Sequence, residues 1–173
     1  VDFLDAGDAP LVFTLGSAAV HVAGDFYRES VEAARLLGRR AILLTGTEAQ
    51  MPDDLPDGIV AFPYAPFGAL FPRATAIVHQ GGVGTTGQAL CAGVPTLIVP
   101  FSHDQPDNAA RTVRLGTGRT LARAEYKAPR VAQELATLLH DEACASHAEA
   151  VGKIVRAEHG ARHAVDLLST LLA

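Results

Sequence analysis

Short apolar runs alternate with segments of helical period along the first two thirds of the chain. Near-continuous apolar runs are typical of strands in a parallel sheet covered on both faces, and the helical segments between them supply the crossovers. The pattern therefore predicts an α/β fold with a parallel sheet flanked by helices. The β-prone runs span residues 11–15, 41–45, 58–62, 75–79 and 96–100.

The helical segments between these runs have recognisable faces and ends. Val22, Phe26 and residues 33–37 repeat at helical spacing and predict one helix, and residues 85–92 predict another that stops at Gly93. Glycine is favoured just beyond the last turn because it adopts the left-handed conformation without steric cost. Both segments are expected to cross over between parallel strands.

After residue 117 the pattern changes from strand to helix. A weak apolar run over 117–121 predicts a sixth strand, and the spacing beyond it is helical to the end. We therefore expect a single Rossmann-like domain over 1–173 with a helical C-terminal tail. Three tail helices are marked by apolar residues, namely Val131, Leu135, Leu138 and Leu139; Val151, Ile154 and Val155; and Val165, Leu168 and Leu172.

Composition narrows the class of protein. The 173 residues are 49% hydrophobic and 19% charged, which suits a soluble globular domain with its own core. The net charge is -5 and the 14 Lys and Arg residues are scattered, so nucleic acid is not an expected partner. No apolar run approaches the ~20 residues of a transmembrane helix, and a cytoplasmic protein is expected. Two isolated cysteines and dispersed histidines predict no metal site, and no cofactor is expected.

Glycines and hydroxyls follow the predicted fourth strand. In an open parallel sheet, ligands bind at the carboxyl ends of the strands. His79 ends this strand, and Gly82 and Gly84 lead into a helix with Thr85 and Thr86 in its first turn. Glycines let a phosphate approach the backbone, while the free N–H groups and the dipole of the helix start attract negative charge. The stretch predicts a phosphate site, and a tight turn held by a structural histidine is the alternative.

The same glycines also match a dinucleotide-binding pattern. Gly82, Gly84 and Gly87 have the spacing G-x-G-x-x-G, and Asp104 follows about 20 residues later. The acid of such a fingerprint is expected at the end of the next strand, but Pro100 occupies that end. NAD binding is therefore a remote alternative.

A second polar loop follows the predicted fifth strand. Asp104 and Gln105 stand side by side before a helix, with Pro106 in its first turn. A carboxylate and a carboxamide together offer several acceptors and two donors, which suits the vicinal hydroxyls of a sugar. Capping of the helix by Asp104 is an alternative that is compatible with sugar binding.

Together, these loops resemble a known signature. The stretch HQGGVGTTGQALCAGVPTLIVPFSHDQPDNAAR is similar to the donor-binding signature of family 1 glycosyltransferases, which have the GT-B fold, and especially to bacterial rhamnosyl-, sterol- and natural-product-type members. The resemblance extends to Leu15-Gly16-Ser17 in the first loop and to Tyr64-Ala65-Pro66 after the third strand. It implies that the chain is the C-terminal half of a GT-B fold.

The resemblance also implies a role for each loop. The donor would be a UDP- or dTDP-hexose, with its diphosphate on the first loop and the glycine turn, its sugar on the acid and amide pair, and its nucleobase along two aromatic side chains. Plant members have Trp and Gln at those two aromatic positions, so uracil and thymine both remain open. The implied ligands are Gly16, Ser17, His79, Gly82, Gly84, Thr85 and Thr86 for the diphosphate, Asp104 and Gln105 for the sugar, and Tyr64 and Phe67 for the nucleobase.

For the reaction, the resemblance implies inverting transfer of the sugar to a hydroxyl of a small molecule or lipid acceptor. The general base and most of the acceptor pocket belong to an N-terminal domain that is absent from residues 1–173, so the isolated chain is expected to be inactive. In the family the final helix crosses back toward that domain. Its apolar face is expected here to pack on the core or to form a homodimer. A nucleotide-sugar epimerase and a nucleotide-binding module without transferase activity remain alternatives.

Overall fold

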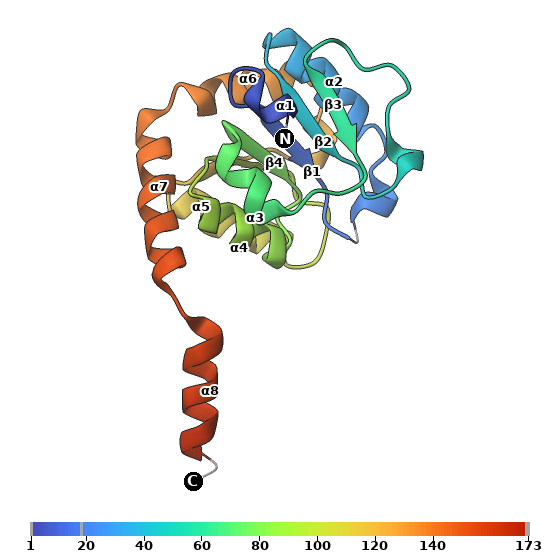
Figure 1. Ribbon diagram of the computed structural model, residues 1–173. Coiled ribbons are helices and arrows are strands. Elements are labelled where there is room, and N and C mark those ends of the chain that lie inside the picture. The colour runs from blue at the N-terminus through green and yellow to red at the C-terminus, as the bar shows by residue number, and fades with distance from the viewer. Residues whose placement is uncertain (1, 18, 172–173) are drawn as a thin grey trace.

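Residues 2–17 and 19–171 are described in a computed structural model, and their strands form one sheet (Figure 1). The strand order is β3-β2-β1-β4-β5-β6, and every neighbouring pair is parallel. The predicted strands are confirmed, although each is one or two residues shorter than its apolar run. They are β1 (Leu11–Thr14), β2 (Ala41–Leu44), β3 (Ile59–Phe62), β4 (Ala76–His79), β5 (Thr96–Ile98) and β6 (Gly118–Thr120).

Helices cover both faces of the sheet, as apolar strands require. On β1, Leu11 and Phe13 pack into one hydrophobic core and Val12 packs into another, because successive side chains of a strand point to opposite faces. Helices α2 and α6 cover the first core, and α3 and α4 cover the second with α5 beside them (Figure 1). The α-helices are α1 (Asp2–Asp5), α2 (Phe26–Leu36), α3 (Phe67–Leu70), α4 (Val83–Ala92), α5 (Gln105–Arg114), α6 (Ala128–Leu139), α7 (Glu142–Ala157) and α8 (Gly160–Leu171), and the 3-10 helices are η1 (Ala19–Val22), η2 (Glu48–Gln50), η3 (Phe71–Arg73) and η4 (Arg123–Glu125).

The first long helix begins later than its apolar spacing predicted. Helix α2 starts at Phe26, whereas Val22 belongs to η1 and is 54% exposed. Gly24 lies between them with a φ of 56°, and this left-handed conformation interrupts a right-handed helix. The placement of Val22 on the helix was therefore wrong. The end of α4 is as predicted, because Gly93 has a φ of 72° and follows the last turn.

The strand order creates a switch point between β1 and β4. The chain runs outward from β1 through β2 to β3, and then returns to add β4 on the other side of β1. The connections after β1 and β4 therefore diverge, and open α/β sheets bind ligands where this happens. Gly16 and Ser17 follow β1, and the glycine turn follows β4. Two of the predicted ligand loops thus flank the switch point.

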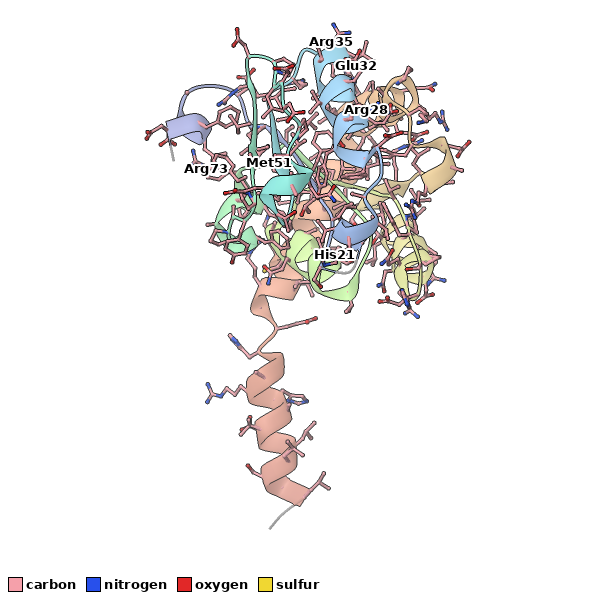
Figure 2. All side chains as sticks on the ribbon, turned by 90° about the vertical axis from the view of Figure 1, so that its right-hand side faces the viewer. His21, Arg28, Glu32, Arg35, Met51 and Arg73 are labelled. Atoms are coloured by element: carbon pink, nitrogen blue, oxygen red, sulfur yellow. The ribbon has the colours of Figure 1, made fainter. Side chains whose placement is uncertain are left out.

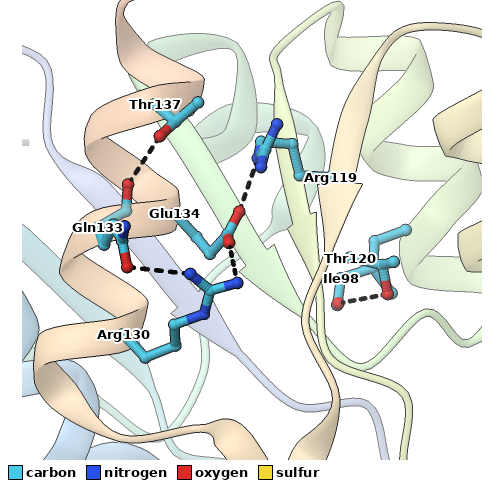
Figure 3. A network of polar contacts seen from close by, with 7 residues as sticks. All are labelled: Ile98, Arg119, Thr120, Arg130, Gln133, Glu134 and Thr137. Carbon is cyan, nitrogen blue, oxygen red and sulfur yellow. Dashed lines mark hydrogen bonds and ion pairs between the residues drawn. The ribbon is translucent and has the colours of Figure 1, made fainter.

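A buried carboxylate ties α6 to the last strand. Glu134 on α6 is 5% exposed, and it pairs with Arg119 Nε and Arg130 Nη2, each at 2.7 Å (Figure 3). An unpaired buried charge would cost several kcal/mol, and two cations offset that cost. The ion pair between Arg119 and Glu134 therefore joins β6, the strand with the weakest apolar pattern, to α6.

The fully buried face of helix α7 consists of small residues, and none of the aliphatic residues that predicted the helix is fully buried. Cys144, Ala148 and Gly152 are buried on its inner face, whereas Ile154 is 63% exposed. A Cβ at Gly152 would lie 2.7 Å from the Cα of Gly93, so glycine permits the close approach of α7 to the end of α4. The helix was predicted, but its buried face was not.

Helix α8 projects away from the α/β body (Figure 1), and Figure 2 shows the same from the side. Residues 160–171 are all exposed, including Val165, Leu167 and Leu168 at 60%, 55% and 58%. The apolar face is therefore present but does not pack on the core, and the homodimer stays a prediction. Leu172 lies outside the described residues. Within 2–17 and 19–171, no helix is long and apolar enough to cross a membrane.

Candidate functional site

A cleft of about 630 Å³ opens at the carboxyl end of the sheet. It is bordered by the loops after β1, β2 and β3 and by the first turns of α4, so it spans the switch point. The predicted ligands that line it are Gly16, Ser17, Tyr64, Phe67, Gly84 and Thr85. The remaining lining residues are Thr14, Leu15, Val20, His21, Leu44, Gly46, Thr47, Pro63, Ala65 and Gln88.

The other predicted ligands lie next to this cleft and do not line it. His79 is the last residue of β4 and Gly82 is the N-cap residue of α4, so both border the turn between the two elements. The start of α5 packs against that turn, since the backbone oxygen of Gln105 would lie 3.2 Å from a Cβ at Gly81. The ligands outside the lining are His79, Gly82, Thr86, Asp104 and Gln105.

The start of α4 points the first backbone N–H groups of a helix away from its own hydrogen-bond ladder. Gly82 is its N-cap residue, and the first N–H bonded back onto it is that of Thr86, 2.9 Å from Gly82 O. The earlier N–H groups of a helix have no partner within it and carry partial positive charge. A Cβ added at Gly84 would meet nothing within 4 Å, so the first turn faces open space. A phosphate oxygen can therefore approach the backbone here.

His79 is fully buried beneath the turn and holds it in place. Its Nδ1 accepts a hydrogen bond from Gly81 N–H at 3.0 Å, and burial lowers the pKa of the ring to about 4. The imidazole is therefore neutral at pH 7, and with Nδ1 accepting, its proton lies on Nε2. That Nε2 has no partner among the described residues. The ring thus holds the turn through Nδ1 and has a donor left at Nε2. A structural role and a phosphate-binding role for His79 are therefore compatible.

Gln80 is a site residue that the sequence analysis did not single out. Its side chain is 5% exposed and lies between the first loop and the glycine turn. A Cβ at Gly82 would come within 2.7 Å of Gln80 Nε2, and a Cβ at Gly16 would overlap the same atom. Gly16 and Gly82 therefore leave room for the Gln80 amide, whereas Gly84 leaves room for the cleft. The adjacency of Gln80 to His79 was the only signal in the sequence.

The loop before α5 is organised by its own polar side chains. Asp104 occupies the N-cap position, but its side chain makes no cap hydrogen bond, so the capping interpretation was wrong. Gln105 is buried, and its Oε1 accepts from Phe101 N–H at 2.7 Å and Ser102 N–H at 3.0 Å. His103 has a φ of 58°, a conformation that costs energy for a residue with a side chain and recurs at functional sites.

Two aromatic side chains border the opposite side of the cleft. Tyr64 is 76% exposed, so its ring is free to contact a planar ligand. Phe67 is half-buried and stacks on Phe71, with ring centroids 4.4 Å apart and planes at 14°. Phe67 is thus a core residue that also reaches the cleft.

The geometry does not support the dinucleotide alternative. Strand β5 ends at Ile98, and Asp104 comes only at the start of α5. The acid that binds a ribose in that fingerprint belongs at the end of the strand. Across the described parts of the chain, no group of three or more His, Cys, Asp or Glu side chains is placed to hold a metal ion.

Comparison with known proteins relates the whole chain to one group of enzymes. Residues 35–165 match the family described as the erythromycin biosynthesis protein CIII-like, C-terminal domain. Over 169 residues the chain is 38% identical to O-mycaminosyltylonolide 6-deoxyallosyltransferase of Streptomyces fradiae, covering 96% of this chain and 39% of that protein. It is 31% identical over 169 residues to a sterol 3-beta-glucosyltransferase of Arabidopsis thaliana, covering 95% of this chain and 26% of that enzyme.

Solved structures similar to this chain are also glycosyltransferases. The glycotransferase of kitacinnamycin superposes with a TM-score of 0.86 at 28% identity, covering 97% of this chain and 44% of that one. Glycosyltransferase VinC in complex with dTDP superposes with a TM-score of 0.76 at 27% identity, covering 91% of this chain and 40% of that one. The chain spans less than half the length of these relatives. The resemblance to GT-B glycosyltransferases is thus confirmed, and the chain belongs to the erythromycin biosynthesis protein CIII-like C-terminal domain family.

Proposed function

We propose that the chain is the donor-binding half of a glycosyltransferase that takes a hexose from UDP or dTDP and passes it to an acceptor hydroxyl. One observation carries the proposal: a single cleft at the switch point joins the β1 loop, the start of α4 and an exposed tyrosine. Helix dipole, backbone donors and an aromatic face are the complements of a diphosphate and a base. The proposed donor-binding domain comprises residues 1–173.

The diphosphate is assigned to the β1 loop and the start of α4. Gly16 and Ser17 line the same cleft as Gly84 and Thr85, so both loops can supply donors to one ligand. Buried polar atoms without partners gather behind this turn, on His79 Nε2, Gln80 Oε1 and Thr86 Oγ1. Buried polar groups are normally hydrogen-bonded. His79 Nε2 and Thr86 Oγ1 can donate, so these two atoms favour an anionic ligand, whereas Gln80 Oε1 can only accept. Backbone dipoles and side-chain donors would then neutralise the diphosphate without a metal.

The nucleobase is assigned to Tyr64, with Phe67 behind it. The exposed phenol ring offers a flat apolar surface on which a pyrimidine would stack. Thymidine diphosphate is the first nucleotide to try, since VinC is described in complex with dTDP. UDP is the second.

The sugar is assigned to Asp104 and Gln105. Asp104 uses Oδ2 to accept from Asn108 at 2.8 Å, which leaves Oδ1 to accept from a sugar hydroxyl. The Oε1 of Gln105 is engaged by the loop backbone, so its amide nitrogen is the group left to donate. Together, Asp104 and Gln105 would form hydrogen bonds with two hydroxyls of the sugar.

Transfer itself would need the missing half of the enzyme. A base in the N-terminal domain would activate the acceptor hydroxyl, and attack from the face opposite the diphosphate would invert the anomeric carbon. This chain would stabilise the negative charge that accumulates on the departing diphosphate. The named relatives modify a tylonolide and a sterol, so a hydrophobic small molecule or lipid is the proposed acceptor.

A calorimetric titration with dTDP, UDP, their hexose conjugates and NAD tests the proposal. We expect a pyrimidine diphosphate to bind and NAD not to bind. Binding of NAD with no response to either pyrimidine diphosphate would overturn the proposal in favour of a dinucleotide site.

The two nitrogens of His79 give separable predictions. His79→Ala is expected to weaken dTDP binding by ~1.5 to 3 kcal/mol, the range for a hydrogen bond to a charged group. His79→Asn keeps an acceptor near the position of Nδ1 for Gly81 N–H, and His79→Gln keeps a donor near Nε2. If Nε2 binds phosphate, Gln restores more affinity than Asn in titration calorimetry. Restoration by Asn alone would assign His79 to the turn and not to the ligand.

Asp104 and Gln105 are predicted to affect the sugar and not the nucleotide. Gln105→Glu keeps an oxygen for the two loop N–H groups but removes the amide donor, and Asp104→Ala removes the carboxylate. Both variants should bind dTDP as the unaltered chain does and lose the added affinity of the hexose conjugate, about tenfold by calorimetry. Equal losses for dTDP and its conjugate would mean that the pair only shapes the loop.

A further inference from the structure

Asn108 joins the two ligand loops. It lies on α5 one turn after Asp104, and its Nδ2 donates to the backbone oxygen of Gly81 and to Asp104 Oδ2, each at 2.8 Å. Gly81 belongs to the turn after β4 and Asp104 to the loop after β5. One side-chain amide therefore spans the proposed diphosphate and sugar regions.

The orientation of this amide follows from its partners. Both are acceptors, a carbonyl and a carboxylate, and an NH2 group has two hydrogens to give them. Rotating the amide by half a turn would place its oxygen against both acceptors and lose both bonds. Nδ2 thus faces the turn, with each of its hydrogens in use.

These bonds continue a chain that begins at His79. Gly81 donates its N–H to His79 Nδ1 at 3.0 Å and accepts from Asn108 through its oxygen, and Asn108 in turn donates to Asp104. Gly81 is itself constrained, since its φ is 88° and a Cβ there would lie 2.7 Å from Ile98 Cγ2. The carboxylate of Asp104 is therefore fixed relative to a rigid turn, although Asp104 itself is exposed.

We propose that Asn108 is a positioning residue that sets the Asp104 carboxylate relative to the diphosphate turn. By occupying Oδ2 it keeps Oδ1 directed to one place, where a donor-sugar hydroxyl is bound. An exposed aspartate would otherwise lose rotamer freedom on binding, and prior ordering removes that cost. The inference rests on the proposed function, because it takes Asp104 to be a sugar ligand.

A double-mutant cycle separates positioning from a structural role. The measured quantity is the sugar gain, the ratio of the dissociation constant of dTDP to that of its glucose or rhamnose conjugate, whichever binds more tightly. Asn108→Ala is expected to reduce the sugar gain about fivefold and to change dTDP affinity less than twofold. In the Asp104→Ala background, Asn108→Ala is expected to cause no further loss of sugar gain. Asn108→Asp, similar in size but unable to donate to a carboxylate when ionised, should behave as Asn108→Ala does.

Asp107→Ala is the matched control, because it breaks the 2.6 Å bond of Arg111 to Asp107 on the same helix without reaching Gly81. It should leave the sugar gain unchanged. The inference is overturned if both Asn108 variants retain the full sugar gain, or if Asn108→Ala reduces it equally with and without Asp104. If the unaltered chain binds neither dTDP nor UDP, the proposed function fails first. If it binds dTDP but shows no sugar gain, the inference fails while the nucleotide site stands.

Discussion

No transfer of hexose is expected from this chain alone, even with a donor that it binds. In a GT-B enzyme the donor lies between two domains, and closure aligns the acceptor hydroxyl and excludes water. Alignment of this kind can supply effective molarities of about 10⁵ M or more, and half a cleft supplies none of it. The chain spans 39% of its Streptomyces fradiae relative, so the remainder would have to provide the acceptor site and the base.

Mass spectrometry of donor, free sugar and glycosylated acceptor would measure this. The chain should bind the donor and leave it intact with macrolide and sterol acceptors, and fusion to the N-terminal part of a relative should give product. A Gly84→Val sample, assayed at a donor concentration well below the dissociation constant of this variant, serves as the blank, since turnover that is equal in both samples then comes from a contaminant. Turnover that is present in the unaltered chain and absent from this blank would contradict the half-enzyme proposal and require a base among the described residues. His21 would then be tested first because it lines the cleft.

Gly84→Val is expected to weaken dTDP binding by about 100-fold, or about 2.7 kcal/mol. The new side chain would enter open space within the cleft, since a Cβ at Gly84 meets nothing within 4 Å. It would therefore stand where phosphate approaches the first N–H groups of α4. Valine has a somewhat higher helix propensity than glycine, so the fold should not suffer.

Gly87→Val is the matched control for this variant. Gly87 is on the same helix, a Cβ there also meets nothing within 4 Å, and it does not line the cleft. Titration calorimetry should show an unchanged dissociation constant for this control, with similar melting temperatures for both variants. If Gly84→Val and the unaltered chain bind dTDP equally tightly, the diphosphate does not bind at the start of α4. Gly82→Val gives no such test, because its side chain would meet Gln80 Nε2.

Most of the architecture could be predicted because parallel sheets leave a strong trace in the sequence. A strand such as β1, which is covered on both faces and buried at every position, is apolar along nearly its whole length. Gly93 ends α4 where predicted because the left-handed conformation there favours glycine. The prediction for Val22 failed because apolar spacing continued across Gly24, while the backbone there turned left-handed. Spacing records which side chains are apolar and not where the backbone changes direction.

The candidate site could be predicted only as a set of loops. The carboxyl ends of parallel strands share one edge, so the loops after Leu15, Phe62, His79 and Pro100 were expected to carry the chemistry there. Which side chains face the cleft could not be deduced in this way. Gly82 and Gly84 look equivalent in the sequence, yet one accommodates Gln80 and the other opens to the cleft. That difference depends on a side chain packed between two loops from distant parts of the chain.

The α/β class, the parallel strands, the ends of several helices and the loops that carry polar chemistry were all predictable from the residue pattern, because each depends on local conformation or on an apolar period. Only the three-dimensional structure placed Gln80 between two loops, buried the small-residue face of α7 and left α8 exposed. It also decided that Asn108 holds Asp104 against Gly81. These features are contacts between segments brought together by the strand order, and no local pattern encodes which atoms meet across them.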